Sequence, residues 1–164
     1  MATGPRYRVP FRRKREGKTD YRKRAKLVMS GKPRLVVRKS LKYAVVQLIE
    51  YHLTGDVTVA SASSEELKGL GWKGSASNIR AFYLTGLMCG LRAVDKKHKV
   101  AVFDSGHYSL NRKSKIFAAL KGSLDAGMDV PYGSDVLPDD ETVKDKDVEI
   151  IIKKIRKSKS GGKK

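Results

Sequence analysis

The sequence has few of the residues that build covalent links, metal sites or membrane spans. Of its 164 residues, one is cysteine and three are histidine. The lone Cys89 excludes an internal disulfide and suits a reducing cytosol, and so few thiol and imidazole ligands exclude a thiolate zinc site. The longest stretch without charge, 81–91, has eleven residues, whereas a spanning helix needs about 20 apolar ones. We therefore expect no membrane span, and the charged start of the chain is unlike a secretory signal.

Acidic residues are scarce at both ends of the chain. Residues 1–42 hold 16 basic and 2 acidic side chains, residues 43–152 hold 13 and 15, and residues 153–164 hold 7 and none. The formal net charge of +19 therefore divides into +14, −2 and +7 along the chain. With 40% hydrophobic residues for a packed core, this distribution predicts a nearly neutral globular body with two basic extensions.

Basic extensions suit three roles: binding to nucleic acid, binding to an anionic membrane surface, or a solvated tail that aids solubility. Aromatic residues help to choose among them, because Tyr7, Phe11 and Tyr21 alternate with arginines and lysines and could stack on unpaired bases. A membrane-surface helix needs a continuous apolar face, and Pro5 and Pro10 interrupt any helix there. Nucleic acid is therefore the favoured partner, and neither a membrane nor a small-molecule substrate is expected.

Hydrophobic spacing and turn residues predict the secondary structure. The expected elements are an extended arm over 1–18, a short basic helix at 19–30, strands at 34–39, 43–53 and 57–63, a loop or short helix at 65–74, a helix from Ser75 or Ser77 to about 94, a strand at 99–104, a helix at 112–126 and a helix over 139–157. Short connections make the first three strands an antiparallel meander. The consecutive apolar residues at 100–103 are typical of a central parallel strand.

This element order predicts an α/β fold: a three-layer α/β/α domain with a mixed sheet and helices on both faces, to which the arm, its short helix, and a C-terminal helix with a basic tail are added. Gly86 and Gly90, four residues apart, predict a close approach of their helix to the sheet. Residues 158–164 are expected to be disordered unless an anion orders them. The expected segments are a basic RNA-binding arm and helix (1–32), the globular domain (33–138), and the C-terminal helix and tail (139–164).

No motif argues strongly for an enzyme. Asp104, Ser105 and His107 are the residue types of a hydrolytic triad, but near neighbours in sequence cannot converge as triad members do, so a turn after a strand is expected. A metal cluster can be imagined from the acidic residues Asp135, Asp139, Asp140 and Glu141, which lie where carboxylates favour a helix start. The alternative function is a metal-dependent nucleic-acid-processing enzyme that uses Asp104. The sequence otherwise predicts no catalytic residue, metal or cofactor.

Three further residues or segments invite a role. Cys89 is expected to be a small buried hydrophobic residue, and Trp72 either stacks on a base or anchors the packing of its glycine-rich loop. In the loop after the predicted fourth strand, Tyr108 precedes Asn111, Arg112, Lys113 and Lys115 at a helix N-terminus. Such a terminus favours phosphate, and the cations strengthen this preference.

Several stretches together resemble the eighteenth large-subunit ribosomal protein family, which binds 5S ribosomal RNA, and most closely its archaeal and eukaryotic branch. They run in order along the chain: 11–21 (FRRKREGKTDY), 33–37 (PRLVV), 59–62 (VASA), 102–106 (VFDSG) with Tyr108, 118–122 (AALKG), and 125–127 (DAG) with Pro131. The resemblance implies a structural protein of the central protuberance of an archaeal-type, cytoplasmic ribosome. It implies 5S rRNA, 23S rRNA and neighbouring large-subunit proteins as partners, an α/β core, and a basic N-terminal arm that lies on RNA.

Charge, aromatic interleaving and this resemblance together select the residues expected to contact RNA. These are Arg6, Tyr7, Arg8, Phe11, Arg12, Arg13, Lys14, Arg15, Lys18, Tyr21, Arg22, Lys23, Arg24, Lys26, Lys32, Arg34, Arg38, Lys39, Lys42, Tyr108, Asn111, Arg112, Lys113 and Lys115. They would bind by neutralising phosphates and by stacking on bases, with no chemical step.

Overall fold

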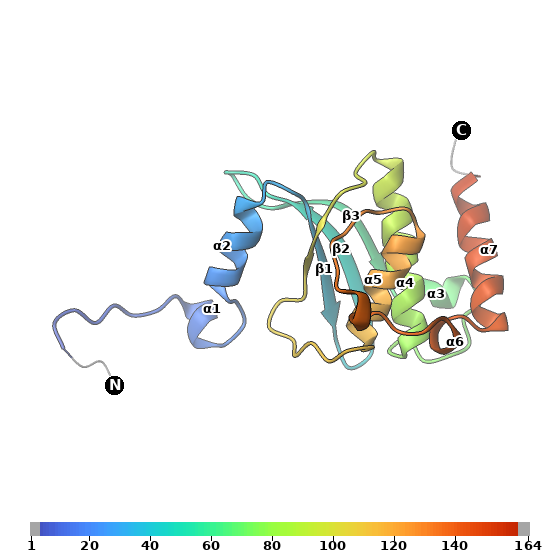
Figure 1. The fold of residues 1–164 in the computed structure, drawn as a ribbon, viewed down its shortest axis with the longest axis horizontal. Helices are drawn as coiled ribbons and strands as arrows, with labels where there is room; N and C mark the ends of the chain where they lie inside the picture. The colour runs from blue at the N-terminus through green and yellow to red at the C-terminus, as the bar shows by residue number, and fades with distance from the viewer. Residues whose placement is uncertain (1–3, 161–164) are drawn as a thin grey trace.

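The structure, a computed structural model, describes residues 4–160. Figure 1 shows its helices and strands in chain order. They are α1 (Arg12–Arg15), α2 (Tyr21–Met29), β1 (Arg34–Lys39), β2 (Ala44–Glu50), β3 (Val57–Ser63), α3 (Glu66–Gly69), α4 (Ile79–Asp95), β4 (Val102–Asp104), α5 (Lys115–Asp125), the 3-10 helix η1 (Ser134–Val136), α6 (Asp140–Val143) and α7 (Lys146–Ser160).

The sheet is mixed, with strand order β3-β2-β1-β4. β1 and β3 have the predicted bounds and pair antiparallel with β2, which confirms the meander. β4 pairs parallel with β1, so it lies at the edge of the four-stranded sheet, and the expectation of a central strand is wrong. Its segment is apolar for another reason: Phe103 stacks on Phe117 of α5, and the side chain of Ala101 is fully buried.

The main core lies between one face of the sheet and helices α4 and α5. Leu35 and Val37 of β1 pair with Leu48 and Val46 of β2, and all four side chains are buried on that face. The α/β class and the mixed sheet are confirmed. The two long helices do not divide between the faces, however, because both pack on this face and against each other. On the other side of the sheet lies α2 (Figure 1).

The glycines of α4 allow a close approach to α5, not to the sheet as expected. A Cβ atom at Gly86 would overlap the carbonyl oxygen of Ala119, and one at Gly122 of α5 would overlap the carbonyl oxygen of Tyr83. The two helices therefore meet backbone to backbone, with a glycine from each at the contact. Gly90 extends the contact by one turn, since its Cβ would press on Ala126.

The ends of the helices follow from local residues. Asn78, not Ser75 or Ser77, caps α4, because its Oδ1 accepts from the N–H of Ala81 at 2.7 Å. Gly127, with a φ of +96°, follows α5, which starts at Lys115 and ends at Asp125, next to the predicted end at residue 126. In the arm, expected to be extended throughout, the four residues of α1 form one helical turn.

Two helices replace the single one expected over 139–157. Lys144 is extended (φ −101°, ψ 116°) and separates α6 from α7. Despite its β-branched run, α7 is helical, because Val148, Ile151 and Ile155 recur at helical spacing and are buried in the core. Residues 158–160 continue α7 and are not disordered as expected. The rest of that expectation, 161–164, lies outside the described residues.

Trp72 and Cys89 both have structural roles. Trp72 belongs to the core, and its indole N–H donates to the carbonyl oxygen of Ser75 at 3.3 Å, so it anchors its loop. Cys89 is fully buried, and burial raises the pKa of its thiol to about 12. It therefore acts as a small hydrophobic residue, as predicted.

The glycine contact between α4 and α5 yields a stability prediction. Gly86→Ala places a methyl group against the backbone of Ala119, which cannot move without separating the helices. We expect urea unfolding to show a loss of at least about 2 kcal/mol. The control is Gly69→Ala in α3, where no atom lies within 4 Å of the added Cβ and where we expect a change within about 0.5 kcal/mol. Equal effects of the two substitutions would contradict the role given to the contact.

Candidate nucleic-acid interface

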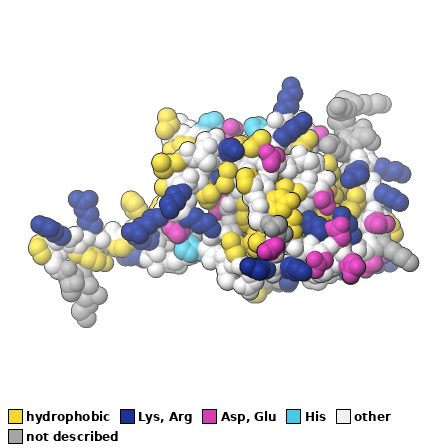
Figure 2. Space-filling model, viewed as in Figure 1, with side chains coloured by type: hydrophobic (Ala, Val, Ile, Leu, Met, Phe, Trp, Pro, Cys, Tyr) yellow, Lys and Arg dark blue, Asp and Glu magenta, His cyan; other side chains and the backbone are white. Residues whose placement is uncertain are grey.

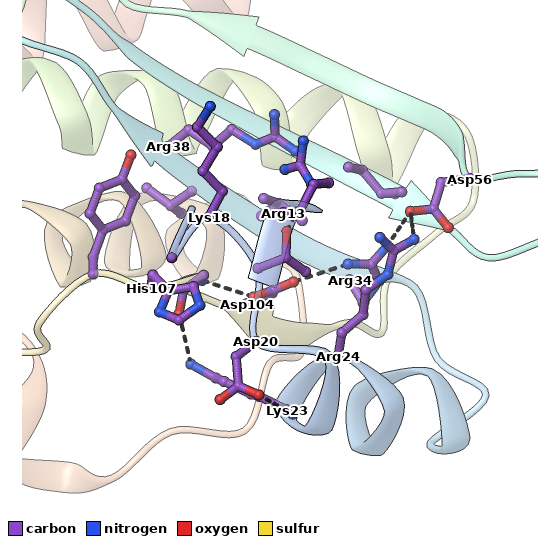
Figure 3. Close-up of a pocket in the computed structure, with 17 residues that line it drawn as sticks. Arg13, Lys18, Asp20, Lys23, Arg24, Arg34, Arg38, Asp56, Asp104 and His107 are labelled. Atoms are coloured by element: carbon purple, nitrogen blue, oxygen red, sulfur yellow. Dashed lines mark hydrogen bonds and ion pairs between the residues drawn. The ribbon is translucent and has the colours of Figure 1, made fainter. Parts of the chain in front are cut away.

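A cavity of 430 Å³ lies between α2 and the sheet (Figure 3). Five segments contribute to its wall: the arm, α2, β1, the region from the end of β2 to the turn before β3, and the loop after β4. The charged residues that line it are Arg13, Lys18, Asp20, Lys23, Arg24, Arg34, Arg38, Asp56 and Asp104. Cations thus outnumber carboxylates, so the cavity favours an anion.

A buried arginine organises this cavity. Arg34 is 5% exposed, and its guanidinium bonds to two carboxylates: Nη1 to Asp104 Oδ2 at 3.0 Å and Nη2 to Asp56 Oδ2 at 2.7 Å. Figure 3 shows Arg34 between these two side chains. The carboxylates come from β4 and from the turn before β3, so one cation joins three segments of the sheet. Its charge is used within the fold, although the sequence selects Arg34 for RNA contact.

Polar contacts hold α2 in place over the sheet. Arg24 shares the Asp56 carboxylate at 2.8 Å, and the Lys23 ammonium donates to the Ser105 hydroxyl at 3.0 Å. Every residue of α2 remains at least partly exposed, so these contacts, rather than a buried apolar face, fix the helix on the sheet. The position of α2 therefore depends on charge pairing.

Asp20 caps the start of α2. Oδ1 of Asp20 accepts from the backbone N–H groups of Arg22 at 2.9 Å and Lys23 at 3.1 Å. These two donors, that of Lys23 first, hold the pKa of the Asp20 carboxyl below its usual range. The carboxylate thus stays charged and serves the helix, leaving the cations of α2 for external anions.

On β1, alternate residues face the cavity. Arg34, Val36 and Arg38 have period-2 spacing, so their side chains share one face. Val36 and Ile49 are buried and give this side of the cavity an apolar floor. Arg38 is exposed, and it lies with Arg13 and Lys18 across the cavity from Asp20 and Lys23 (Figure 3).

The predicted contact residues of the arm are exposed to solvent. They are Arg6, Tyr7, Arg8, Phe11, Arg12, Arg13, Lys14, Arg15 and Lys18. Phe11 is 73% exposed, yet its ring packs against that of Tyr21 with 5.4 Å between centroids. Glu16 pairs with Lys18 and Arg12, which lower the pKa of its carboxyl.

The predicted residues outside the arm divide into two groups. Arg22, Lys26, Lys32, Lys39 and Lys42 are exposed around α2 and β1. The predicted contact residues at the start of α5 do not line the cavity. Lys113 instead pairs with Asp139 at 2.8 Å and Lys115 donates to the carbonyl oxygen of Ser77, while Asn111 and Arg112 are exposed. Tyr108, which does line the cavity, donates to the carbonyl oxygen of Lys39 at 2.9 Å.

Neither the hydrolytic triad nor the metal cluster considered from the sequence forms among residues 4–160. Asp104 bonds to Arg34 and to the N–H of Gly106, while the hydroxyl of Ser105 accepts from Lys23, so the segment forms a turn after β4 and not a triad. Among residues 4–160, no three His, Cys, Asp or Glu side chains group as a metal ion would require. In the same part of the chain, no helix is long and apolar enough to cross a membrane.

Sequence reasoning missed several residues of the cavity. Asp56, Val36 and Ile49 line it, and none of the three is among the residues selected from the sequence. The alternation along β1 could have placed Val36 beside Arg38. Nothing local indicates that Asp56 binds Arg34, since 22 residues separate them.

Charge is unevenly spread over the surface. On the face in Figure 2, lysine and arginine side chains cover the arm and α2 at one end, and acidic side chains gather near the opposite end, around α6 and the start of α7. The arrangement provides a solvent-accessible cationic surface with aromatic rings, supported by a polar network that fixes α2. Such a surface can bind a polyanion with unpaired bases.

Comparison with known proteins gives consistent matches. The profile of the family described as "Ribosomal large subunit proteins 60S L5, and 50S L18" matches residues 5–105. Proteins named large ribosomal subunit protein uL18 are similar over most of the chain. That of Aeropyrum pernix is 52% identical over 145 residues, covering 88% of this chain and 68% of its own length. That of Methanobrevibacter smithii is 54% identical over 143 residues, covering 87% of this chain and 74% of its own length.

The buried network yields a second stability prediction. Arg34→Met leaves Asp56 and Asp104 without their shared cation, and we expect a loss of about 3 kcal/mol in urea unfolding. Arg38→Met is the matched control, because Arg38 lies on the same strand and face but is exposed, and we expect a change within about 0.5 kcal/mol. Similar losses in both variants would show that the pairing does not stabilise the fold.

Proposed function

Because the chain belongs to the family of ribosomal large-subunit proteins described as 60S L5 and 50S L18, it is a structural protein of the large subunit of the cytoplasmic ribosome and not an enzyme, and we propose that it binds 5S rRNA. We further propose that it helps attach 5S rRNA to 23S rRNA in the central protuberance, beside neighbouring large-subunit proteins. Its similarity to archaeal proteins over most of its length agrees with the archaeal-type ribosome that the sequence implied.

The observation that carries the proposal is the exposed cationic surface of the arm, α2 and the cavity. Residues 1–42 have a net charge of +14, and the two acidic side chains among them are already engaged, Glu16 with Lys18 and Asp20 with the start of α2. Arg24 and Arg34 pair with Asp56 and Asp104 within the fold. The exposed cations of the arm, and Arg22, Lys26, Lys32, Arg38, Lys39 and Lys42, remain accessible to phosphates. Each phosphate contact releases counterions from the RNA, so affinity should fall steeply with salt.

Aromatic rings in the arm add a contribution that is not ionic. Tyr7 and Phe11 are 48% and 73% exposed, which is a large apolar area to leave in water. The packing of Phe11 on Tyr21 of α2 leaves much of the ring accessible to an unpaired base. Stacking of bases on such rings would position the RNA along the arm.

The fold supplies the fixed part of the interface. Arg34 with its two carboxylates holds α2 over the sheet, and the exposed Arg38 and Lys18 line the cavity between them. A phosphate bound there would meet cations from both β1 and the arm. The protein would therefore act by charge neutralisation and shape recognition, without a chemical step.

The first test of this function removes charge from the arm. In Arg6→Gln/Arg8→Gln/Lys14→Gln, three exposed cations are lost from the contact, so the slope of log K against log salt for 5S rRNA should become shallower by about 2–3. Filter binding or fluorescence anisotropy across a salt series measures it.

The matched control removes three cations from outside the arm and cavity. Lys73, Lys97 and Lys99 are exposed, and the triple change to Gln alters the net charge by the same amount. We expect this control to keep the wild-type slope. A slope that changes equally in both triple variants, or in neither, would refute the assignment of the contact to the arm.

The second test removes a ring without changing charge. Phe11→Leu should weaken 5S rRNA binding about tenfold, since stacking on one base contributes about 1–3 kcal/mol, and should leave the salt slope unchanged. The control is Tyr132→Leu, which removes an aromatic ring that is 51% exposed and lies outside the arm. If Phe11→Leu binds like this control, Phe11 does not stack on RNA.

A further inference from the structure

The last helix carries a second cationic surface, separate from the surface of the arm. The first turn of α7 contains the acidic residues Asp147 and Glu149 after Lys146, and the charged residues that follow are all basic. Lys153, Lys154, Arg156 and Lys157, here called the α7 basic face, are all exposed. Beyond them the sequence adds three lysines and no acidic residue.

The body of the protein holds α7 in a fixed position. Val148, Ile151 and Ile155 are buried in the core, and Lys154 donates to the carbonyl oxygen of Leu70 at 2.9 Å. Before the helix, Arg80 of α4 pairs with Asp145 at 3.1 Å. With one side of α7 anchored in this way, Lys153 and Lys157 lie one turn apart on the opposite, solvent-facing side.

The clustering of like charge is unfavourable for an isolated helix. Lys153 is three residues from Arg156 and four from Lys157, the spacings at which like charges on a helix repel. Cations near the C-terminus do favour the helix dipole, but that effect falls off within the last turn. Lys153 lies about two turns before Ser160, the last residue of α7. The dipole therefore does not account for Lys153. Glu149, four residues before it, offsets part of the repulsion, and an external polyanion would relieve the rest.

The α7 basic face is separate from the surface of the arm. In Figure 1 the arm and α7 lie at opposite ends of the longest axis. Between them, residues 43–152 have a net charge of −2, and on the face in Figure 2 acidic side chains gather beside the start of α7. The two cationic surfaces are therefore suited to two separate anionic segments.

We propose that the α7 basic face binds the phosphate backbone of a second ribosomal RNA segment, in 23S rRNA, while the arm holds 5S rRNA. This inference rests on the proposed function and extends it by assigning the attachment of 5S rRNA to 23S rRNA to particular residues. The two surfaces would act as the two ends of a bridge, and the neutral body with its α4–α5 core would keep them apart.

The test neutralises three residues of the α7 basic face. Lys153→Gln/Arg156→Gln/Lys157→Gln keeps the buried side of the helix, so unfolding in urea should match wild type. Three measurements are made on the full chain: binding to 5S rRNA, binding to 23S rRNA, and capture of labelled 5S rRNA on immobilised 23S rRNA. We expect unchanged 5S affinity and salt slope, a 23S slope shallower by about 2–3, and at least tenfold less captured 5S rRNA.

Two further variants make the test specific. Lys153→Arg/Arg156→Lys/Lys157→Arg keeps every charge and should capture 5S rRNA like wild type. Lys73→Gln/Lys97→Gln/Lys99→Gln changes the net charge as the α7 variant does, and should also capture it normally. Wild-type capture by the neutral α7 variant, or an equal loss in the Lys73/Lys97/Lys99 control, would overturn the proposal.

The binding measurements separate this proposal from the proposed function. If the α7 variant lost 5S rRNA binding as strongly as the arm variant, the two surfaces would serve one contact and the bridge would be refuted. If wild type failed to bind 5S rRNA, the proposed function would fail, while weaker 23S binding by the α7 variant would still support the α7 contact. Equal 23S rRNA binding by wild type and the α7 variant would overturn the proposal for α7. So would an α7 variant that keeps its 23S rRNA binding but loses binding to anionic lipid vesicles.

Discussion

The pairing of Arg34 with Asp56 and Asp104 is the interaction on which the functional end of the molecule depends. A guanidinium only 5% exposed needs carboxylate partners, because an unpaired buried charge is strongly destabilising. The two partners come from the turn before β3 and from β4, so the same bond pattern fixes the strands to one another. Asp56 also binds Arg24, which extends the network to α2 and sets the position of the basic helix.

The acidic residues explain why such a basic chain has a stable fold and still presents cations. Within the body they neutralise cations at structural positions, as Lys121 and Lys144 show by pairing with Asp140. At the two ends few acidic residues are available, and the net charges there are +14 and +7. Folding therefore uses charge pairing where the chain is packed and leaves unneutralised charge where RNA is expected.

Much of the fold could be predicted because its signals are local. The bounds of β1 and β3, the cap of α2 by Asp20 and the end of α5 at Gly127 each follow from a few adjacent residues. The errors concern partners distant in sequence. The spacing of Gly86 and Gly90 indicated a close approach but not its target, which proved to be the backbone of α5. Likewise, the order of elements did not decide that both long helices share one face of the sheet.

The sequence by itself determined the family, the α/β class, the position of most helices and strands, and the division of charge along the chain. The tertiary structure decided which cations can reach a partner. Arg34 and Arg38 are two residues apart on one face of β1, yet the first is buried between two carboxylates and the second is exposed. Only the fold places α7, the helix that carries Lys153, at the opposite end from the arm. The physical reason is that burial and pairing depend on residues far apart in the sequence, whereas composition and periodicity record only near neighbours.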